Sequence, residues 1–248
     1  MRAWLLLLLT GLWAGPLQAQ PVKLRLCTSD VPFHPYTMPD GSGLFQRRLA
    51  LLARAAGVEV VPTVAPRARC LQSTRTGAAD ALIGVFAPER LAWMAYPMRE
   101  GVADEERGLG RVRFLLYRRV GTHFGWDGRR FTGLGDQPLG LQFGYQYGVK
   151  VADLGVAVDD RATSAEQLMA KLARGRVALA LMQPEQAQLV LSRMPDAGIE
   201  ALDTPFTSQA FYVIVTQDFW RRHPEQVQRL WSANPPWAAS SPSAAPGP

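Results

Sequence analysis

The segment GAADALIGVFAPERLAWMAYP, from Gly77 to Pro97, constrains the fold more than any other part of the chain. Its first residue suits the end of a preceding helix, because glycine readily adopts the left-handed conformation that closes helices. The apolar run Ala81–Val85 is typical of a short strand buried on both faces of a parallel sheet. Pro88 then favours the first position of a new helix, with Arg90 in its first turn. A strand that ends at a helix start, beside a fixed cation, is suited to hold an anion.

Strands and helices alternate on both sides of this segment. Before it, Val22–Cys27 and Val58–Val64 are predicted strands, and Phe45–Ala56 and Arg69–Thr76 are predicted helices. This order predicts a parallel sheet with right-handed crossovers. A second unit follows, with predicted strands at Val112–Arg118, Leu139–Phe143, Val156–Asp159, Val177–Met182 and Phe211–Thr216, helices at Val149–Leu154, Ala165–Arg174, Pro184–Arg193 and His223–Trp231, and a loop at Gly121–Gln137.

The first nineteen residues have the pattern of a secretory signal peptide. Arg2 is the only charge before Lys23, and the apolar block that begins at Trp4 is too short for a spanning helix. Pro16 and the small residue Ala19 favour cleavage over a signal anchor. We therefore expect an exported, periplasmic protein, and no later stretch is apolar enough to span a membrane.

The remaining chain of about 229 residues suits two small lobes better than one large domain. We expect the signal peptide at 1–19, the first part of lobe 1 at 20–112, lobe 2 at 113–204 and a return to lobe 1 at 205–232. The final stretch, 233–248, is of low complexity and is predicted to be disordered.

The chain contains two cysteines, Cys27 and Cys70. In an oxidising compartment they favour a disulfide, and the first strand and second helix that carry them are neighbours in a doubly wound unit. A metal site is the weaker alternative, because the two cysteines and three histidines match no zinc-binding spacing.

The opening segment resembles the family 3 extracellular solute-binding proteins of bacterial ABC importers. Members have Gly-x-x-Asp, an apolar strand, Gly, a short polar run, Thr-x-x-Arg and an aromatic end closed by Pro. The matching positions here are Gly77–Asp80, Gly84, Ala87–Arg90 and Ala95–Pro97, with Gly144–Gln146 and Gly175–Ala178 in the second unit. Ala87 departs from the family, which usually has Thr or Ser there. Cys27 and the run Pro66–Cys70 resemble an uncharacterised exported subgroup.

The resemblance covers most of residues 22–231 and implies an α/β, two-lobed type II periplasmic-binding-protein fold with two hinge strands. Such a protein closes on a small polar ligand, and a membrane permease recognises the closed conformation. By resemblance, Arg90 pairs with a ligand carboxylate, for which the planar guanidinium is well suited. Taken alone, the same residue is more typical of a solvated or ion-paired surface position, and only the resemblance favours a ligand contact.

The second lobe departs from the family at the position that binds the ligand's ammonium group. Backbone N–H groups at Tyr145 and Gln146 are expected to contact the anion. Gln183 stands where the family has an aspartate, and a neutral amide is a weak partner for a buried ammonium. Glu185 is more typical of a first-turn carboxylate favoured by the helix dipole, and it would substitute as the partner only if the helix start shifts it inward. An organic acid without an ammonium group therefore also fits.

Further ligand-binding candidates come from the loop after the first strand, at the sheet edge where open α/β sheets bind ligands. Phe33 and Tyr36 in this loop, and Phe86 beside the Arg90 turn, are candidates for stacking on a ligand. Each is equally compatible with ordinary packing. Arg69, like the neighbouring Arg67, lies near the end of the second strand and is a candidate second cation, with a surface position as its alternative.

Three function classes compete. The leading one is a monomeric periplasmic binding protein that captures an amino acid or organic acid for an ABC permease. The second is a periplasmic sensor that docks on a membrane receptor. The third, a dehydratase-like enzyme, lacks a recognisable catalytic set, so we expect no enzyme activity, no cofactor and no metal. The net charge of +6 is scattered along the chain and does not indicate a nucleic-acid partner.

Overall fold

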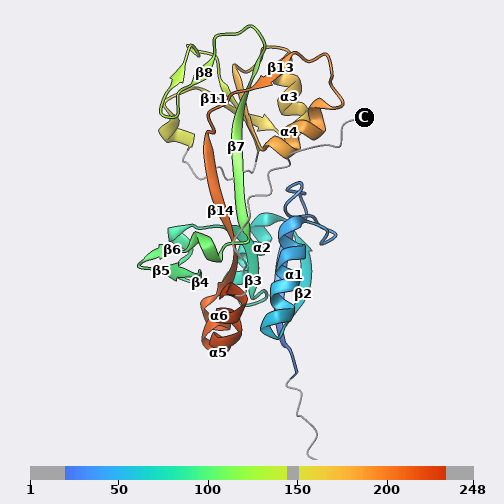
Figure 1. The fold of residues 1–248 in the computed structure, drawn as a ribbon, viewed down its shortest axis with the longest axis vertical. Coiled ribbons are helices and arrows are strands. Elements are labelled where there is room, and N and C mark those ends of the chain that lie inside the picture. Colours follow the sequence, from blue (N-terminus) through green and yellow to red (C-terminus); the bar gives the residue numbers. More distant parts are fainter. Residues whose placement is uncertain (1–19, 144–150, 233–248) are drawn as a thin grey trace, which may run out of the picture.

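A computed structural model describes residues 20–143 and 151–232. The described chain forms two lobes connected by the long strands β7 (Gly110–Arg119) and β14 (Thr207–Thr216), as Figure 1 shows. No helix in these two ranges combines the length and the apolar character needed to cross a membrane. The predicted signal peptide, the predicted tail and the Gly144–Gln146 signature lie outside the described residues.

The first lobe contains the predicted parallel unit. Its elements are β1 (Val22–Ser29), α1 (Leu44–Ala56), β2 (Val58–Ala65), α2 (Arg67–Arg75) and β3 (Ala81–Val85). Strand β1 lies between β2 and β3 and is parallel to both. Helix α1 ends where predicted, because Gly57 adopts φ 71° and its N–H caps the last carbonyls of the helix.

The second lobe repeats this arrangement on a smaller scale. Strand β10 (Leu139–Gln142) lies between β11 (Val158–Ala162) and β12 (Leu179–Met182) and is parallel to both. Helix α3 (Ala165–Ala173) is capped by the Ser164 hydroxyl, which accepts a hydrogen bond from the N–H of Gln167. Helix α4 (Pro184–Leu191) follows β12, and η3 (Val151–Leu154) and β13 (Ile199–Ala201) complete the lobe.

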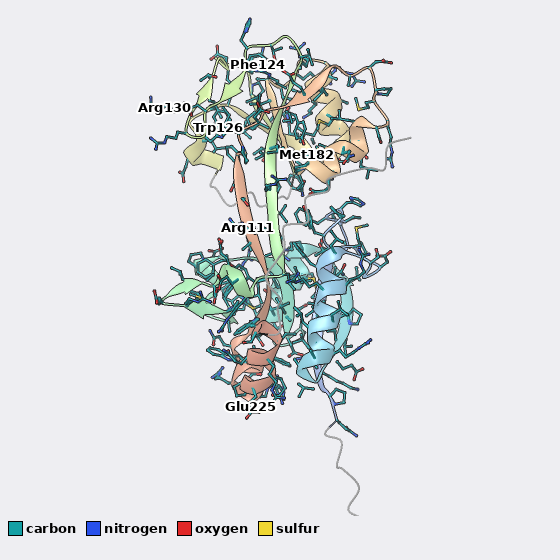
Figure 2. All side chains as sticks on the ribbon, viewed as in Figure 1. Arg111, Phe124, Trp126, Arg130, Met182 and Glu225 are labelled. Atoms are coloured by element: carbon teal, nitrogen blue, oxygen red, sulfur yellow. A yellow bond between two sulfur atoms is a disulfide. The ribbon has the colours of Figure 1, made fainter. Side chains whose placement is uncertain are left out.

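The two hinge strands join the lobes into one sheet path of order β11-β10-β12-β7-β14-β3-β1-β2. Residues Gly110–Phe114 of β7 pair with β14, whereas Leu115–Tyr117 pair with β12. One continuous strand therefore belongs to lobe 1 in its first half and to lobe 2 in its second. Figure 2 shows Arg111 on this connection and Met182 in the lobe above it.

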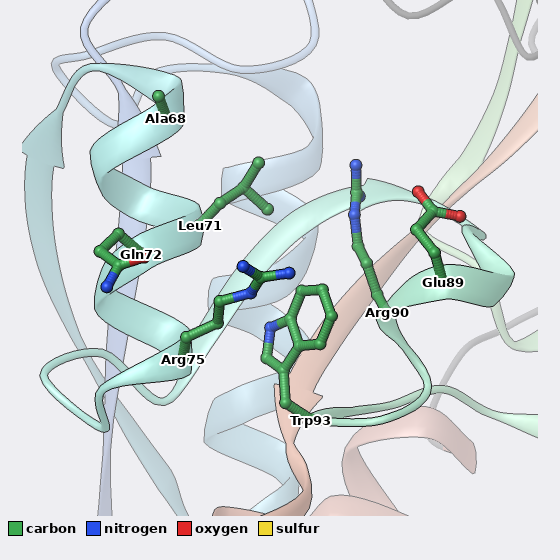
Figure 3. Close-up of a pocket in the computed structure, with 7 residues that line it drawn as sticks. All are labelled: Ala68, Leu71, Gln72, Arg75, Glu89, Arg90 and Trp93. Carbon is green, nitrogen blue, oxygen red and sulfur yellow. The ribbon is translucent and has the colours of Figure 1, made fainter.

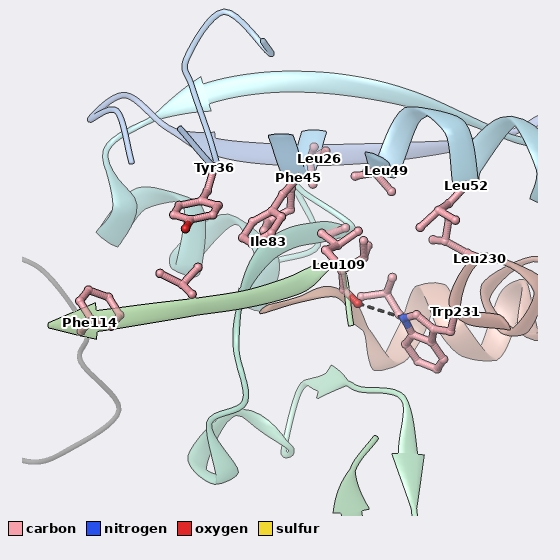
Figure 4. Packing of buried hydrophobic residues seen from close by; sticks show 14 of the residues in the cluster. Leu26, Tyr36, Phe45, Leu49, Leu52, Ile83, Leu109, Phe114, Leu230 and Trp231 are labelled. Carbon is pink, nitrogen blue, oxygen red and sulfur yellow. Dashed lines mark hydrogen bonds between the residues drawn. The ribbon is translucent and has the colours of Figure 1, made fainter. Parts of the chain in front are cut away.

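The helices that follow β14 close the core of lobe 1. They are α5 (Gln217–Arg222), which was not predicted, and α6 (Pro224–Ser232). In Figure 4, Trp231 donates a hydrogen bond from Nε1 to the carbonyl of Val213, and Leu230 lies near Leu52 of α1. The apolar face of α6 thus fixes the returning segment against the first helix.

Several short elements differ from the sequence prediction. The helix expected to begin at Pro88 is a single 3-10 turn, η1 (Pro88–Arg90), because Ala87 has no capping side chain and β4 (Met94–Ala95) soon pairs with β14. The expected loop Gly121–Gln137 contains the hairpin β8 (Gly125–Trp126) and β9 (Phe131–Thr132). The elements that were not predicted also include β5 (Met98–Arg99), β6 (Val102–Ala103) and η2 (Glu105–Arg107).

The predicted disulfide between Cys27 and Cys70 is present and joins β1 to α2. The Cα atoms of the two residues are 5.4 Å apart, and both side chains are almost fully buried beside Ala79. The bond closes a loop with a sequence separation of 43 residues, so it restricts the unfolded chain considerably.

We predict that replacing both cysteines with serine lowers the free energy of unfolding by about 4 kcal/mol, because the unfolded chain regains its loop entropy. Denaturant titration of the oxidised parent and the double variant measures this loss. The reduced parent is the matched control and should fall to nearly the same stability. A double variant as stable as the oxidised parent would contradict the prediction.

Asp80, the aspartate of the Gly-x-x-Asp motif, holds together distant parts of lobe 1. Its buried carboxylate accepts hydrogen bonds of 2.7 Å from both Nε and Nη2 of Arg25, and Nη2 of Arg222 lies 3.6 Å away. Burial alone would raise the pKa of Asp80, but the hydrogen bonds from Arg25 hold it below its ordinary value.

We predict that Asp80→Asn lowers the free energy of unfolding at pH 7 by about 2 kcal/mol, the scale of charge-assisted hydrogen bonds. Because the pKa is lower in the folded state, the stabilisation is complete above the unfolded pKa of about 4 and is lost as pH falls through the folded value. The stability difference between parent and variant should therefore shrink at acid pH. Denaturant titrations from pH 7 to pH 3 measure it, with the exposed Asp136→Asn as control.

Candidate functional site

The carboxyl ends of β1 and β3 in lobe 1, and of β12 in lobe 2, lie on the sides of the lobes that face the connecting strands β7 and β14. Ligands of open α/β sheets bind outside the carboxyl ends of parallel strands. In lobe 1 these ends are followed by the Phe33–Tyr36 loop after β1 and by the Phe86–Arg90 segment after β3. In lobe 2, Gln183 follows β12 directly. Tyr145 and Gln146, predicted to act after β10, lie outside the described residues.

Arg90 is the most unusual residue of this group. Its side chain is only 7% exposed, although it comes from a three-residue turn. Its Nη1 atom is buried and has no hydrogen-bond partner within the described chain. A buried guanidinium without a carboxylate is costly, so the protein retains here a strong donor that it does not use itself.

A second arginine, Arg67, approaches the same region from the first residue of α2. Its Nη1 donates a hydrogen bond of 3.2 Å to the carbonyl of Ile83 in β3. Burial, followed by the positive charge of Arg90, lowers the pKa of Arg67 to about 10. Arg69, the cation favoured from the sequence, instead lies exposed on the same helix.

Aromatic side chains surround Arg90. Phe86 packs edge to face against Tyr96, with ring centroids 5.0 Å apart. The Tyr96 hydroxyl is buried beside Arg90 and has no hydrogen bond of ordinary geometry among the described residues. Burial raises the pKa of Tyr96, although the charge of Arg90 acts in the opposite direction. The hydroxyl therefore stays protonated at neutral pH and is available as a neutral hydrogen-bonding group.

A pocket of about 310 Å³ lies beside Arg90, between α2 and the segment around η1. Its lining residues are Ala68, Leu71, Gln72, Arg75, Glu89, Arg90 and Trp93. In Figure 3 the Arg90 side chain extends toward the end of α2 that carries Ala68. The guanidinium of Arg75 instead stacks on Trp93, 4.2 Å from the ring centroid. Arg75 therefore has an aromatic partner.

The loop after β1 packs largely into the core of lobe 1. Tyr36 is 5% exposed and stacks on Phe45, with ring centroids 5.0 Å apart. Phe33 is half-buried and stacks on Phe211, 5.4 Å between centroids. Both residues thus serve as packing residues of lobe 1.

The lobe 2 end of the site is formed by Gln183 and Glu185. Gln183 is 1% exposed, and its Nε2 is buried without a partner in the described structure. Glu185 Oε2 is likewise buried without a hydrogen bond of ordinary geometry there, although the Tyr36 phenol interacts with this carboxylate. After burial itself, the charge of Glu185 raises the pKa of Tyr36 in lobe 1 and of Tyr117 in β7. The Glu185 carboxylate therefore lies near phenols of both lobes.

The assembled groups can bind an anion but form no recognisable catalytic set. Lobe 1 contributes the cations Arg67 and Arg90, and lobe 2 contributes the amide donor of Gln183. Within residues 20–143 and 151–232, no group of three or more His, Cys, Asp or Glu residues is placed to hold a metal ion. The sequence analysis did not predict that Arg67 lies close to β3. The glycine at position 84 was the one available indication, because it leaves room for the Arg67 guanidinium.

Comparison with known proteins supports the fold rather than a family. No protein-family model matches the sequence, and no curated protein matches it. Many solved structures share the fold. A histidine kinase sensor domain with similarity to periplasmic binding proteins matches with a TM-score of 0.61 at 12% identity, covering 85% of this chain and 90% of its own.

Two further solved structures contain ligands. The GluR0 ligand-binding core from Nostoc punctiforme in complex with L-glutamate has a TM-score of 0.60 at 11% identity, covering 84% of this chain and 92% of its own. An ancestral arginine-binding protein bound to arginine has a TM-score of 0.61 at 17% identity, and the match covers 86% of this chain and 93% of that protein. The predicted α/β fold with two lobes, of the periplasmic-binding-protein type, is thereby confirmed.

We predict that Arg90→Met raises the free energy of unfolding of the ligand-free protein by about 1–2 kcal/mol, because it removes a buried, unpaired charge and keeps the side-chain volume. Denaturant titration measures the change. Arg54→Met, at an exposed position of α1, is the control and should change stability by less than about 0.5 kcal/mol. If Arg90→Met instead destabilised the protein, Arg90 would have a structural role.

Proposed function

We propose that this chain is a periplasmic binding protein that captures a small carboxylate-bearing solute between its lobes and presents it to an ABC permease. The observation that carries the proposal is the buried guanidinium of Arg90, which has an unpartnered nitrogen at the carboxyl end of β3. A guanidinium fork matches both oxygens of a carboxylate and binds them with charge-assisted hydrogen bonds. A carboxylate bound there would supply the compensation that the buried charge lacks.

The hinge gives the proposed capture its mechanical basis. The lobes share β7, and only β7 and β14 carry described chain between them. Small torsional changes near Phe114 and Leu115, where the pairing partner of β7 changes, would rotate one lobe toward the other. A ligand held by Arg90 from one lobe and Gln183 from the other would favour the closed state, because only that state satisfies both contacts.

A sensor that docks on a membrane receptor is the second candidate function. The observation that favours it is the similarity to a histidine kinase sensor domain, and to the VFT2 domain of Bordetella pertussis BvgS at 15% identity and TM-score 0.59, which covers 85% of this chain and 87% of its own. Both candidates use the same ligand site, so they differ in the partner rather than in the chemistry of binding.

The test is a thermal-shift screen of the protein, unfolded and refolded to remove carried ligand, against amino acids, dicarboxylates and aromatic acids. A ligand that binds only the folded state raises the unfolding midpoint by mass action. We expect one chemical class of carboxylate to raise it, and Arg90→Met to abolish the shift while Arg54→Met retains it. No shift with any acid, or a shift that persists in Arg90→Met, would contradict the proposed site.

The two partner classes are separated once a ligand is known. Import predicts that cells lacking this chain lose high-affinity uptake of the radiolabelled ligand, and that the parent gene restores it whereas the Arg90→Met gene does not. Unchanged uptake in the deletion strain would exclude the import role and favour the sensor.

A further inference from the structure

Two arginines meet at the carboxyl end of β3 from different elements. Arg67 enters from the start of α2, and its Nη1 is hydrogen-bonded to the Ile83 carbonyl. Its Nη2 lies 3.0 Å from the position that a Cβ would take at Gly84. Arg90 enters from the turn after the same strand. The backbone of β3 thus holds the guanidinium of Arg67 over the strand that leads to Arg90.

The charge of this arginine pair is not balanced by the protein. Several exposed or half-buried arginines of the described chain have carboxylate partners, such as Arg25 with Asp80 at 2.7 Å and Arg118 with Glu200 at 2.7 Å. Neither Arg67 nor Arg90 forms an ion pair in the described part of the chain. The one acidic residue that lines the adjacent pocket, Glu89, is exposed and forms no ion pair with either arginine.

Two like charges in a shared, partly buried site raise the free energy of the ligand-free protein. The electrostatic consequence is visible at Arg67, whose pKa is lowered by burial and then by the charge of Arg90. A ligand with one negative charge would neutralise only half of the pair. A ligand with two acidic groups would neutralise both, and each guanidinium could bind one carboxylate.

We infer that Arg67 and Arg90 together form a subsite for a dianionic ligand, a dicarboxylate. The inference rests on the proposed function and specifies its ligand class. Arg67 is the additional specificity-determining residue, because a single carboxylate anchor needs only Arg90.

The opposite lobe is consistent with a ligand that has no ammonium group. Gln183 presents a buried amide donor, Nε2, which suits a carboxylate oxygen. Glu185 is the acidic group at this end, and its charge lies beside the phenols of Tyr36 and Tyr117. A dicarboxylate therefore meets donors on both sides, provided that Glu185 stays with the Tyr36 phenol and does not face the ligand. An ammonium would instead be attracted by the Glu185 carboxylate.

Isothermal titration calorimetry with matched probes tests the inference. Succinate and glutarate carry two charges, and their monoamides succinamate and glutaramate have nearly the same shape with one charge. We expect the parent to bind at least one dicarboxylate more than 10-fold tighter than its monoamide. Arg67→Met should reduce this preference to less than 3-fold, and Arg69→Met, on the same helix but exposed, should retain it.

Two further measurements keep the test decisive. Gly84→Ala displaces the Arg67 guanidinium without removing it and should also weaken dicarboxylate binding, so the conclusion survives if Arg67→Met does not fold. The affinities of L-glutamate and glutarate are then compared, because the two ligands differ by the ammonium group. If L-glutamate bound more tightly, the inference that the ligand lacks an ammonium group would be wrong.

The failures are distinguishable. If the parent binds monoamides and dicarboxylates equally, and Arg90→Met abolishes both, the dianion inference is wrong and the proposed function stands. If Arg67→Met leaves the preference unchanged, Arg67 is not the second anchor. If no carboxylate probe binds the parent at all, the proposed function itself fails along with the inference.

Discussion

The shared strand β7 is the constraint on which the rest of the structure depends. Its first half pairs with β14 in lobe 1 and its second half with β12 in lobe 2, so one stretch of backbone belongs to two sheets. Each half must therefore satisfy the hydrogen-bonding register of its own lobe. Because β14 returns the chain beside β7, the lobes are held at two adjacent points, which permits rotation and restricts translation.

This arrangement also places the polar groups of the site. The carboxyl ends of β2 and β3 in lobe 1 and of β12 in lobe 2 lead into the segments that carry Arg67, Arg90, Gln183 and Glu185. Buried polar atoms are normally hydrogen-bonded, and four side chains with unpartnered buried atoms (Arg90, Tyr96, Gln183 and Glu185) lie at or near these ends. These four side chains are the candidates for ligand contacts, although unpartnered buried atoms also occur elsewhere, for example in Asp104, Trp126 and Gln209.

The chain stabilises itself elsewhere. The disulfide between β1 and α2, the pairing of Asp80 with Arg25 and the packing of α6 against α1 all lie in lobe 1, behind or beside the strand ends. A rigid lobe 1 can hold two unbalanced arginines at one edge, since the free energy that they cost is offset by interactions that do not involve them. The stability of the fold and the affinity of the site are in this way carried by different residues.

The sequence by itself determined the parts that depend on local pattern. The alternation of strands and helices, the Ser164 cap and the Gly57 helix end could be predicted because neighbouring residues dictate them. The pairing of Cys27 with Cys70 could be predicted because the chain has two cysteines. Arg90 was also found from its place after a buried strand. Only the tertiary structure decided that the turn at Pro88 stops after three residues, that Arg67 rather than Arg69 lies over β3, and that β7 serves both lobes. These features depend on contacts between segments far apart in the chain, whose free energies no local pattern records.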